Sequence, residues 1–461
     1  MIKDNSTSEN QIVKQNYFKG YIIFWIGQLI SLLGSNIVQF TIIWWITEET
    51  GSEFFLALAA FLGFGPAIVM TPIAGVFVDR WSRKKIIAGV DLLQAIATVI
   101  LIFIFNFSNL ESSELIWFVL VILTIRGLMQ AFHQPAVEAI IPLLVPKDKL
   151  SRMNGFNYLF GGMIFLIGPV LGALLLEVWL IQEILWIDAI TFVVAVIPTI
   201  IITIPSVIDK AKKEIQKIPF RVEFSEGFSF IKNKQGLFSL LFVFTAANFF
   251  LQPIFILLPL FVTKIHLGGA TDLAFLMAIQ QFGVIAGSIL MSSWKGFRNN
   301  AHGVGIGLFF MYSGMFILAL APTNLAFINL NPIGLEDYWL KTSFLILSAG
   351  MFIIGFTLPI ANVSSQTIWQ KVVPPEKLGR VFSVRVTIAQ ISGPVAILLT
   401  GIIAGYTGII TLVLISGVLG VAFLMYSWLF TGFTKVEQTI QEKDEVTDSL
   451  PLAPPIGVLS E

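Results

Sequence analysis

The sequence contains no cysteine in its 461 residues. Disulfide bonds, thiolate metal sites and a cysteine nucleophile are therefore excluded. Its three histidines, His133, His266 and His302, lie on separate segments, so no histidine cluster indicates a metal site or an intramembrane enzyme. A Gly-x-x-x-x-Gly-Lys-Ser/Thr phosphate-binding loop is also missing, and with it any sign of an ATPase domain. We expect no cofactor, no metal ion and no enzymatic activity.

Charged residues are scarce, at 12% of the chain against about 25% in soluble globular proteins. Hydrophobic residues make up 56%, and the mean hydropathy is +0.86. Such a chain could not cover a water-exposed surface, so the composition predicts a polytopic membrane protein. The 28 bases equal the 28 acids in number, so net charge gives no reason to expect a nucleic-acid partner.

Long hydrophobic runs are abundant. A helix needs about 20 apolar residues to cross a bilayer core about 30 Å thick, and helices satisfy their own backbone hydrogen bonds in hydrocarbon. The first run is too long for a signal-peptide core, so we expect it to be retained. Twelve runs qualify as spans: 18–46, 53–78, 86–107, 114–141, 154–177, 182–204, 236–263, 271–294, 303–321, 342–368, 381–405 and 409–431.

The loops that join successive spans lie on alternate sides of the membrane, and positive charge is distributed unevenly between the two sides. One side carries Arg80, Arg83, Lys84, Lys85, Lys147, Lys149, Arg152, the basic stretch 205–235, Lys295, Arg298, Lys371, Lys377 and Arg380. The other side carries only Lys264 and Lys341, beside ten acids. The positive-inside rule therefore predicts that both termini are cytoplasmic. We expect a multi-pass protein of a prokaryotic cell membrane.

The two halves of the sequence resemble each other. VPKDKLSR (145–152) and VPPEKLGR (373–380) occupy matching loops, and a Gly-Pro pair follows each of them. Two parallel six-helix halves are a transporter architecture, with the substrate site between the halves near the midplane. The predicted units are a cytoplasmic segment 1–17, a six-helix bundle 18–204, a cytoplasmic linker 205–235, a six-helix bundle 236–431 and a disordered cytoplasmic tail 432–461.

Polar side chains concentrate in four of the twelve runs, which are the first helices of each group of three. Buried polar groups are costly in a bilayer and usually face a cavity or a partner. We therefore predict a central cavity between the halves; the alternative is that these groups only join helices, at about 0.6 kcal/mol each. The predicted cavity residues are Gln28, Ser35, Asn36, Gln39, Gln130, His133, Asn248, Gln252, Asn362 and Gln366.

Arg126 lies about 12 residues inside the run 114–141, too deep to reach the surface easily. It needs a carboxylate, carbonyl oxygens or water. The other acids within the runs are Asp91, Glu138 and Asp188. Glu138 lies about 18 Å along the helix from Arg126 and is no direct partner. Wetting near the inner surface is the alternative interpretation for Asp91 and Glu138. Because buried carboxyls can carry protons, these three acids and Arg126 are the candidates for proton coupling.

The stretch GVFVDRWSRKK (75–85) places one acid and four bases in a short loop between two apolar runs. Its spacing, Gly75-x-x-x-Asp79-Arg80-x-x-Arg83-Lys84-Lys85, resembles the loop 2–3 signature of the major facilitator superfamily. Arg126-Gly127 is similar to the arginine motif of that family, and Gly168-Pro169-x-x-Gly172 to the helix 5 motif of its drug–proton antiporters. The resemblance extends over residues 17–431.

Three further stretches are most similar to the macrolide-efflux branch of this family, whose relatives include siderophore exporters: TEETGSE (47–53), HQPAVEAIIPLLVP (133–146) and LGRVFS (378–383). The resemblance implies a secondary transporter that exports hydrophobic or amphipathic, macrolide-like compounds by alternating access and proton antiport. An acid in the first span, which some drug–proton antiporters use, is absent here. The alternatives are a siderophore exporter or a small-nutrient importer; a membrane enzyme or receptor fits less well.

The resemblance also implies a conformational latch made of Gly75, Asp79, Arg80, Arg83 and Lys84. Gly75 would let its helix approach the run 381–405, and the Asp79 carboxylate would face the positive N-terminal end of that run. The matching loop of the second half, SSWKGFRNN (292–300), has no acid, so the latch should be one-sided. We expect a small hydrophobic substrate, protons and the lipid bilayer as partners, and a chain that functions as a monomer.

Overall fold

The computed structural model describes residues 3–107, 110–146, 149–202, 220–234, 236–321, 342–374 and 377–437. Its helices in the first half are α1 (Lys3–Thr50), α2 (Glu53–Arg80), α3 (Arg83–Phe107), α4 (Ser112–Leu144), α5 (Leu150–Leu176) and α6 (Ile181–Ile201). A connecting helix follows, α7 (Phe220–Asn233). The second half contains α8 (Leu237–Leu260), the π-helical η3 (Phe261–Ile265), α9 (Ala270–Ser293), α10 (Asn300–Leu320), α11 (Thr342–Val372), α12 (Leu378–Thr407), α13 (Ile409–Phe430) and the 3-10 helix η6 (Phe433–Lys435).

Twelve helices in these ranges are long and apolar enough to cross a membrane. They coincide with the twelve predicted spans to within a few residues, which confirms the all-α polytopic fold. The elements are helical because an apolar run in hydrocarbon can pair its backbone groups only within itself or in a closed barrel. Turn residues set several boundaries: Ser52 caps α2 by accepting the Phe55 N–H at 3.5 Å, and Gly408, at φ 82°, separates α12 from α13.

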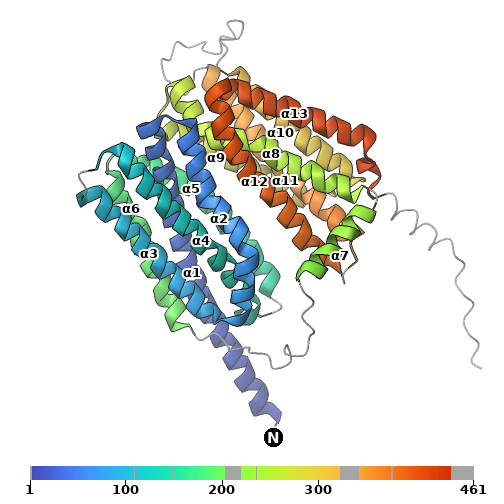
Figure 1. The fold of residues 1–461 in the computed structure, drawn as a ribbon. Coiled ribbons are helices and arrows are strands. Elements are labelled where there is room, and N and C mark those ends of the chain that lie inside the picture. Colours follow the sequence, from blue (N-terminus) through green and yellow to red (C-terminus); the bar gives the residue numbers. More distant parts are fainter. Residues whose placement is uncertain are drawn as a thin grey trace, which may run out of the picture.

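The helices form two bundles of six, and Figure 1 shows the two bundles side by side. We call α1–α6 the N-half and α8–α13 the C-half. In the N-half, α3 packs against α4 and α6, and α1 packs against α5 and α6. In the C-half, α11 packs against α9 and α10, and α8 packs against α12 and α13.

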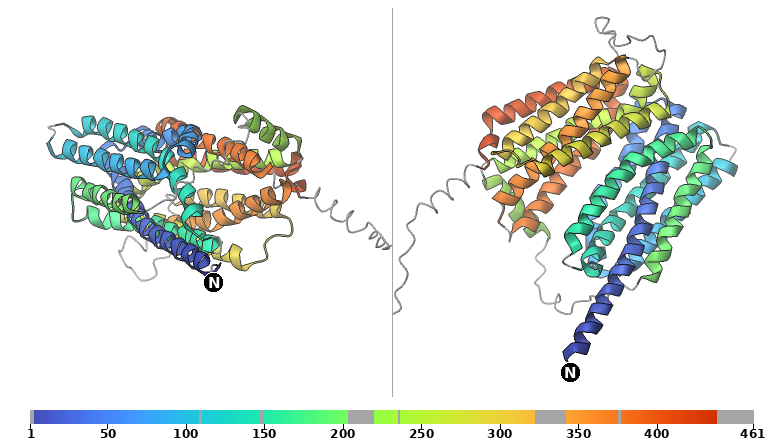
Figure 2. Two further views of the ribbon diagram at one scale, coloured as in Figure 1. Left: turned by 90° about the horizontal axis from the view of Figure 1, so that it is seen from below. Right: turned by 180° about the vertical axis from the view of Figure 1, so that it is seen from behind.

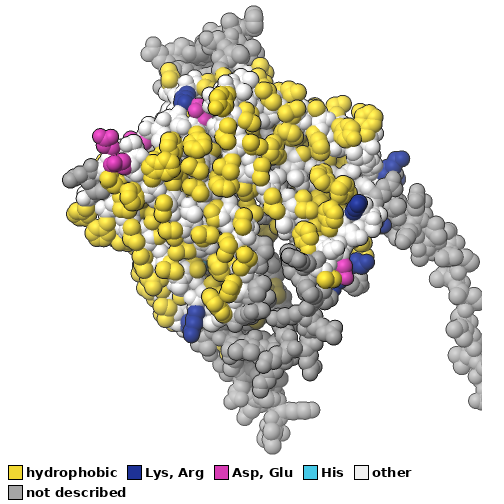
Figure 3. Space-filling view, in the orientation of Figure 1, with side chains coloured by type: hydrophobic (Ala, Val, Ile, Leu, Met, Phe, Trp, Pro, Cys, Tyr) yellow, Lys and Arg dark blue, Asp and Glu magenta, His cyan; other side chains and the backbone are white. Residues whose placement is uncertain are grey.

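Charged side chains separate the two ends of the molecule. We call one the basic end, defined by Arg83, Lys84, Lys85, Lys149, Arg152, Lys371, Lys377 and Arg380. We call the other the acidic end, defined by Glu48, Glu49, Glu53, Glu111, Glu114, Glu177, Glu183 and Asp272. Figure 3 shows hydrophobic side chains over the broad middle of one face, with charged side chains toward its ends. This distribution suits a molecule whose middle is solvated by lipid.

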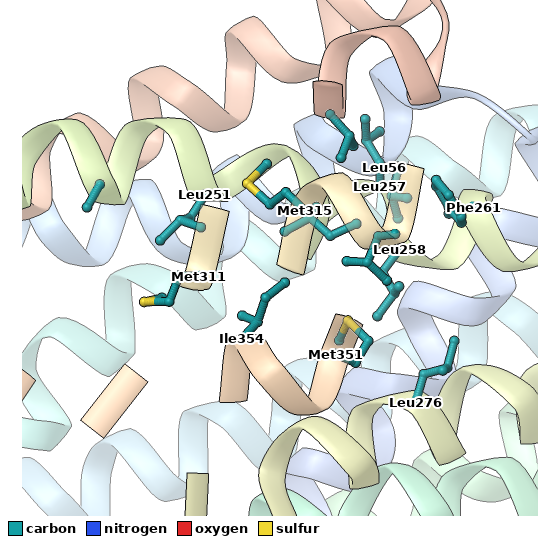
Figure 4. Packing of buried hydrophobic residues seen from close by; sticks show 14 of the residues in the cluster. Leu56, Leu251, Leu257, Leu258, Phe261, Leu276, Met311, Met315, Met351 and Ile354 are labelled. Carbon is teal, nitrogen blue, oxygen red and sulfur yellow. The ribbon is translucent and has the colours of Figure 1, made fainter. Parts of the chain in front are cut away.

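The two halves meet at the acidic end. Lys264 Nζ lies 2.8 Å from Glu53 Oε1, and Thr271 Oγ1 donates a hydrogen bond of 2.9 Å to Glu177 Oε1. A Cβ atom on Gly401 of α12 would lie 3.0 Å from the Glu53 carbonyl oxygen of α2, so only glycine permits this helix approach. One buried apolar cluster continues across the contact (Figure 4), with Leu56 of α2 beside residues of α8.

At the basic end the halves are apart. The ribbons diverge toward this end in Figures 1 and 2. The N-half has an apolar cluster of its own there, which includes Tyr21, Ile87 and Ile140 and is separate from the cluster that joins the halves. Outside its own helix, no described atom lies within 4 Å of a Cβ built on Gly75 of α2 or on Gly379 of α12. The halves therefore form a V that is open at the basic end.

Two segments outside the spans belong to the C-half. Helix α7 lies against α12, where Glu226 pairs with Arg380 and Lys377 Nζ lies 5.3 Å from the Phe230 ring centre. Figure 1 shows α7 beside α12 at the basic end. The predicted linker is thus partly helical, and its residues 203–219 lie outside the described residues.

The chain stays packed for six residues beyond position 431, where a disordered tail was predicted to begin. Glu437 accepts the Asn300 N–H at 2.6 Å and the Asn300 side-chain amide at 2.8 Å, and it lies 3.3 Å from Lys371 Nζ. Phe433 and Val436 are completely buried. The Glu437 carboxylate thus satisfies a donor at the start of α10, where negative charge is favourable. Residues 438–461 lie outside the described residues.

Candidate functional site

Asp188 of α6 is the centre of a buried polar cluster in the N-half. Its side chain is 0% exposed, and its carboxylate accepts hydrogen bonds of 2.9 Å from Ser35 Oγ of α1 and from Thr98 Oγ1 of α3. Arg126 of α4 pairs with the same carboxylate and also donates to Thr98 Oγ1 at 2.9 Å. The guanidinium further lies 5.6 Å from the Phe192 ring centre. The partner of Arg126, which the sequence left open, is Asp188.

Asp91 of α3 is the centre of a second buried cluster. Gln28 Nε2 of α1 donates a hydrogen bond of 3.1 Å to Asp91 Oδ2, and His133 Nε2 of α4 lies 2.9 Å from Asp91 Oδ1 without forming a hydrogen bond to it. The side chain of Asp91 is 1% exposed and that of His133 is 14% exposed. Asp91 is therefore enclosed by the helices of the N-half rather than exposed at its surface.

The two clusters are consecutive layers of one arrangement. On α1, α3 and α4 the contributing residues are seven apart: Gln28 and Ser35, Asp91 and Thr98, and His133 and Arg126. Seven residues are almost two helical turns, so each pair lies on one face with a separation of about 10.5 Å along the axis. Because α1 and α3 run from the basic end while α4 runs toward it, the Asp91 layer lies nearer the basic end.

Helix α6 contributes an acid to only one of these layers. Seven residues beyond Asp188 it presents Ala195, which is completely buried. A Cβ on Gly27 of α1 would lie 3.5 Å from the Ala195 Cα, so α1 and α6 are close at this level. The Asp91 layer therefore has one carboxylate and no arginine among the described residues.

Three of the predicted cavity residues, Gln28, Ser35 and His133, are thus directed at buried acids of their own half. Hydrogen bonding between helices, the alternative interpretation from the sequence, accounts for them. Asn36 donates to the Leu32 carbonyl at 2.8 Å, and Gln39 is half-buried on α1.

Two of the predicted site residues on α4, Gln130 and Glu138, are exposed, and Gln134 Nε2 donates a hydrogen bond of 2.9 Å to Glu138 Oε1. Glu138 is therefore separate from both buried clusters and accessible from the solvent or lipid side of α4.

In the C-half the predicted cavity residues interact with α12. Asn248 of α8 is exposed and donates 3.0 Å to the Ala389 carbonyl, while Gln252 Nε2 would lie 3.5 Å from a Cβ on Gly393. On α11, Asn362 is exposed and Gln366 Oε1 accepts a hydrogen bond of 2.6 Å from Arg385.

Arg385 is a site residue that the sequence reasoning missed. Its guanidinium lies 5.4 Å from the ring centres of Trp369 and Phe382, in addition to the bond to Gln366. The signal was present, since Arg385 is the one charged residue of the apolar run 381–405. Thr98 was also missed, because threonine is unremarkable in a membrane span.

The helix 5 motif packs against α1. A Cβ on Gly168 would lie 2.7 Å from Asn36 Cβ, and one on Gly172 would lie 2.9 Å from Phe40 Cδ1 and 3.1 Å from the Ile37 carbonyl oxygen. Both glycines therefore permit close helix packing. Pro169 lies inside α5, which continues through it.

The latch residues lie at the basic end, and Arg83 and Lys84, whose side chains are described, bind groups of the N-half. Arg83 donates to the Ala139 carbonyl at 3.3 Å, and Lys84 donates to the Ile202 carbonyl at 2.8 Å, both within the N-half. Gly75 has open space around it. The side chains of Asp79 and Arg80 lie outside the described residues.

Comparison with known proteins gives a family for this arrangement. The family model "Major Facilitator Superfamily" matches residues 24–334. The chain is 32% identical over 404 residues to Macrolide efflux protein A of Streptococcus pyogenes, covering 88% of this chain and 94% of that protein. It is 30% identical over 347 residues to Macrolide efflux protein A of Enterococcus faecalis, covering 75% of this chain and all of that protein.

A solved structure of low sequence identity shares the fold. It is a bacterial homologue of the iron transporter ferroportin in an inward-facing state, with a TM-score of 0.64, 12% identity, and coverage of 89% of this chain and 98% of that one. Within the described residues, no three His, Asp or Glu side chains gather closely enough to hold a metal ion.

Proposed function

The chain belongs to the Major Facilitator Superfamily, and from that premise we propose that it exports macrolide-like compounds from the cell by alternating access coupled to proton entry. The observation that carries the proposal is the 32% identity to a macrolide efflux protein across 94% of that protein's length. A match of this extent covers both halves of the chain.

The V shape supports an alternating-access mechanism. We propose that the basic end is cytoplasmic, as the positive-inside rule requires, and that the structure is open to the cytoplasm. Contacts that hold the halves together at the outer end include Lys264 with Glu53 and Gly401 with α2. Export would need these contacts to open and the basic ends to close, with the Asp79 latch engaging the start of α12.

The space between the halves is the proposed substrate path. The exposed polar residues Gln130 of α4, Asn248 of α8 and Asn362 of α11 come from helices of both halves, as expected for a site at the interface of the repeats. Gln252 and Gln366, which contact α12, would support this surface from behind.

Proton entry is the proposed energy source. The N-half buries two carboxylates completely, those of Asp91 and Asp188. Ionisable groups inside a membrane protein typically mark proton paths. Entry of one positive charge releases about 2.3 kcal/mol per 100 mV of membrane potential, in addition to the pH term.

Accumulation measurements test this function. Cells that lack other macrolide pumps and express the chain should accumulate less radiolabelled erythromycin than cells with an empty vector. A protonophore should remove the difference, and an excess of a siderophore should not. Equal accumulation in both cell lines would refute macrolide export. A difference that survives the protonophore would refute proton coupling alone, and efflux that siderophore inhibits would favour the siderophore alternative.

A further inference from the structure

We infer that the proton exchanged during transport binds at the Asp91–His133 pair, whereas Asp188 and Arg126 form a permanent ion pair that does not exchange protons. The inference rests on the proposed proton antiport and names the site at which it happens. The sequence left four residues as candidates, and the contacts of the two layers distinguish between them.

Asp188 is fixed in its charged form by its neighbours. Arginine cannot be deprotonated in proteins, so Arg126 carries a positive charge at all times. A lone guanidinium in this buried position would be very costly, and the Asp188 carboxylate is the group that neutralises it. Ser35 and Thr98 each donate a further hydrogen bond to that carboxylate. Adding a proton to Asp188 would therefore leave a buried positive charge without a counter-ion.

Asp91 has no such constraint. Its two partners are the neutral amide of Gln28 and the imidazole of His133, and histidine changes charge near neutral pH. With one proton shared between them, the pair is neutral overall, either as carboxylate and imidazolium or as carboxylic acid and imidazole. Loss of that proton gives a net charge of −1, so this layer can hold or release a single proton where the Asp188 layer cannot.

The surroundings of Asp91 contain no competing charge among the described residues. Helix α1 presents Gln28, α4 presents His133 and α6 presents Ala195 at this level. Helix α2 makes little contact with α3. The basic side chains described near this level bind groups other than Asp91. Arg83 and Lys84 donate to carbonyls near the basic end, and Arg126 pairs with Asp188 one layer away.

His133 is the group through which the proton reaches Asp91. It is 14% exposed while Asp91 is 1% exposed, and it lies on α4 between the exposed Gln130 and Gln134. In the relay, a proton from water binds His133 Nδ1, and the imidazole turns so that Nε2, which lies 2.9 Å from Asp91 Oδ1, passes its proton to that oxygen. The imidazole changes tautomer, the carboxylate becomes neutral, and release along the reverse path restores both groups.

Binding and transport measurements on purified protein test the assignment. In wild type, proton and erythromycin binding should oppose each other, so the apparent Kd should rise about tenfold from pH 8 to pH 6, within the usual range of coupling between two sites. Asp91→Asn should bind erythromycin with a Kd that changes less than about twofold over that range. In proteoliposomes the same variant should exchange erythromycin across the membrane but should not be driven by a pH gradient.

Two further variants keep the test decisive. Glu437→Gln removes a buried carboxylate outside the N-half and should keep the pH-dependent Kd of wild type. If Asp91→Asn inserts poorly into the membrane, Asp91→Glu serves as the second variant. Its carboxyl should restore part of the pH dependence of the erythromycin Kd. A pH response in Asp91→Asn equal to that of wild type would overturn the assignment and leave proton antiport standing. No pH response in wild type would refute both.

Discussion

The N-half and the C-half share one arrangement of six helices but bury different groups. The N-half contains two fully buried acids with an arginine and a histidine as partners. In the described spans of the C-half, the acid present is Asp272, which lies in the first turn of α9. The same scaffold therefore accommodates buried acids with basic partners in one half and a partly buried arginine, Arg385, bound to a neutral amide in the other.

The C-half contains close backbone contacts of the kind that Gly168 and Gly172 make in the N-half. A Cβ on Gly283 of α9 would lie 2.6 Å from the Phe352 carbonyl oxygen of α11, and one on Gly307 of α10 would lie 2.7 Å from the Ala361 nitrogen. Small residues of this kind stabilise membrane helices because they allow many van der Waals contacts. The comparison teaches that two copies of one fold can bury different chemical groups while both rely on close packing at glycines.

The strongest test of this difference is the ion pair of the N-half. Arg126→Ala should abolish transport, because it leaves the buried Asp188 carboxylate without a counter-ion, at a cost of about 3–5 kcal/mol. The double variant Arg126→Leu/Asp188→Leu should recover thermal stability of the purified protein. Near-normal erythromycin efflux by Arg126→Ala would show that transport does not require the buried ion pair of the N-half.

A smaller effect is expected at the one-sided latch. Asp79→Asn removes the carboxylate that would face the start of α12, an interaction worth about 0.3–1 kcal/mol or more when partly buried. Efflux should fall about two- to fivefold while the amount of protein in the membrane stays constant. Lys295→Gln, in the matching loop of the C-half, is the control and should leave efflux intact. Equal loss of efflux in both variants would show that the loops of both halves contribute, and the latch would then not be one-sided.

The smallest effect is expected from the arginine of the C-half. Arg385→Gln removes one hydrogen bond and two cation–aromatic contacts, each worth about 1 kcal/mol. The melting temperature should fall by a few degrees, and efflux should stay within about twofold of wild type. Complete loss of efflux, as expected for Arg126→Ala, would show that each half contains an essential charge, which would contradict the difference between the halves.

Much of the fold could be predicted because membrane spans are encoded locally, in runs of apolar residues whose length must match the bilayer. The duplication was equally visible in the two matched loops. The site was harder, since the partner of Arg126 depends on how α4 and α6 rotate against each other. Gln28, Asp91 and His133 come from three helices, and each has a second polar residue seven positions away. That shared spacing could have indicated the two layers, but only the packing shows which acid each base contacts.

The packed stretch around Glu437 has a practical consequence for anyone shortening this chain. A truncation after position 431, where the sequence suggests that the last span ends, would strip Phe433 and Val436 from the bundle and leave the Asn300 amide groups without their carboxylate. Fusion partners, affinity tags and deletion boundaries therefore belong after residue 437. The last helix of this transporter ends before its folded domain does.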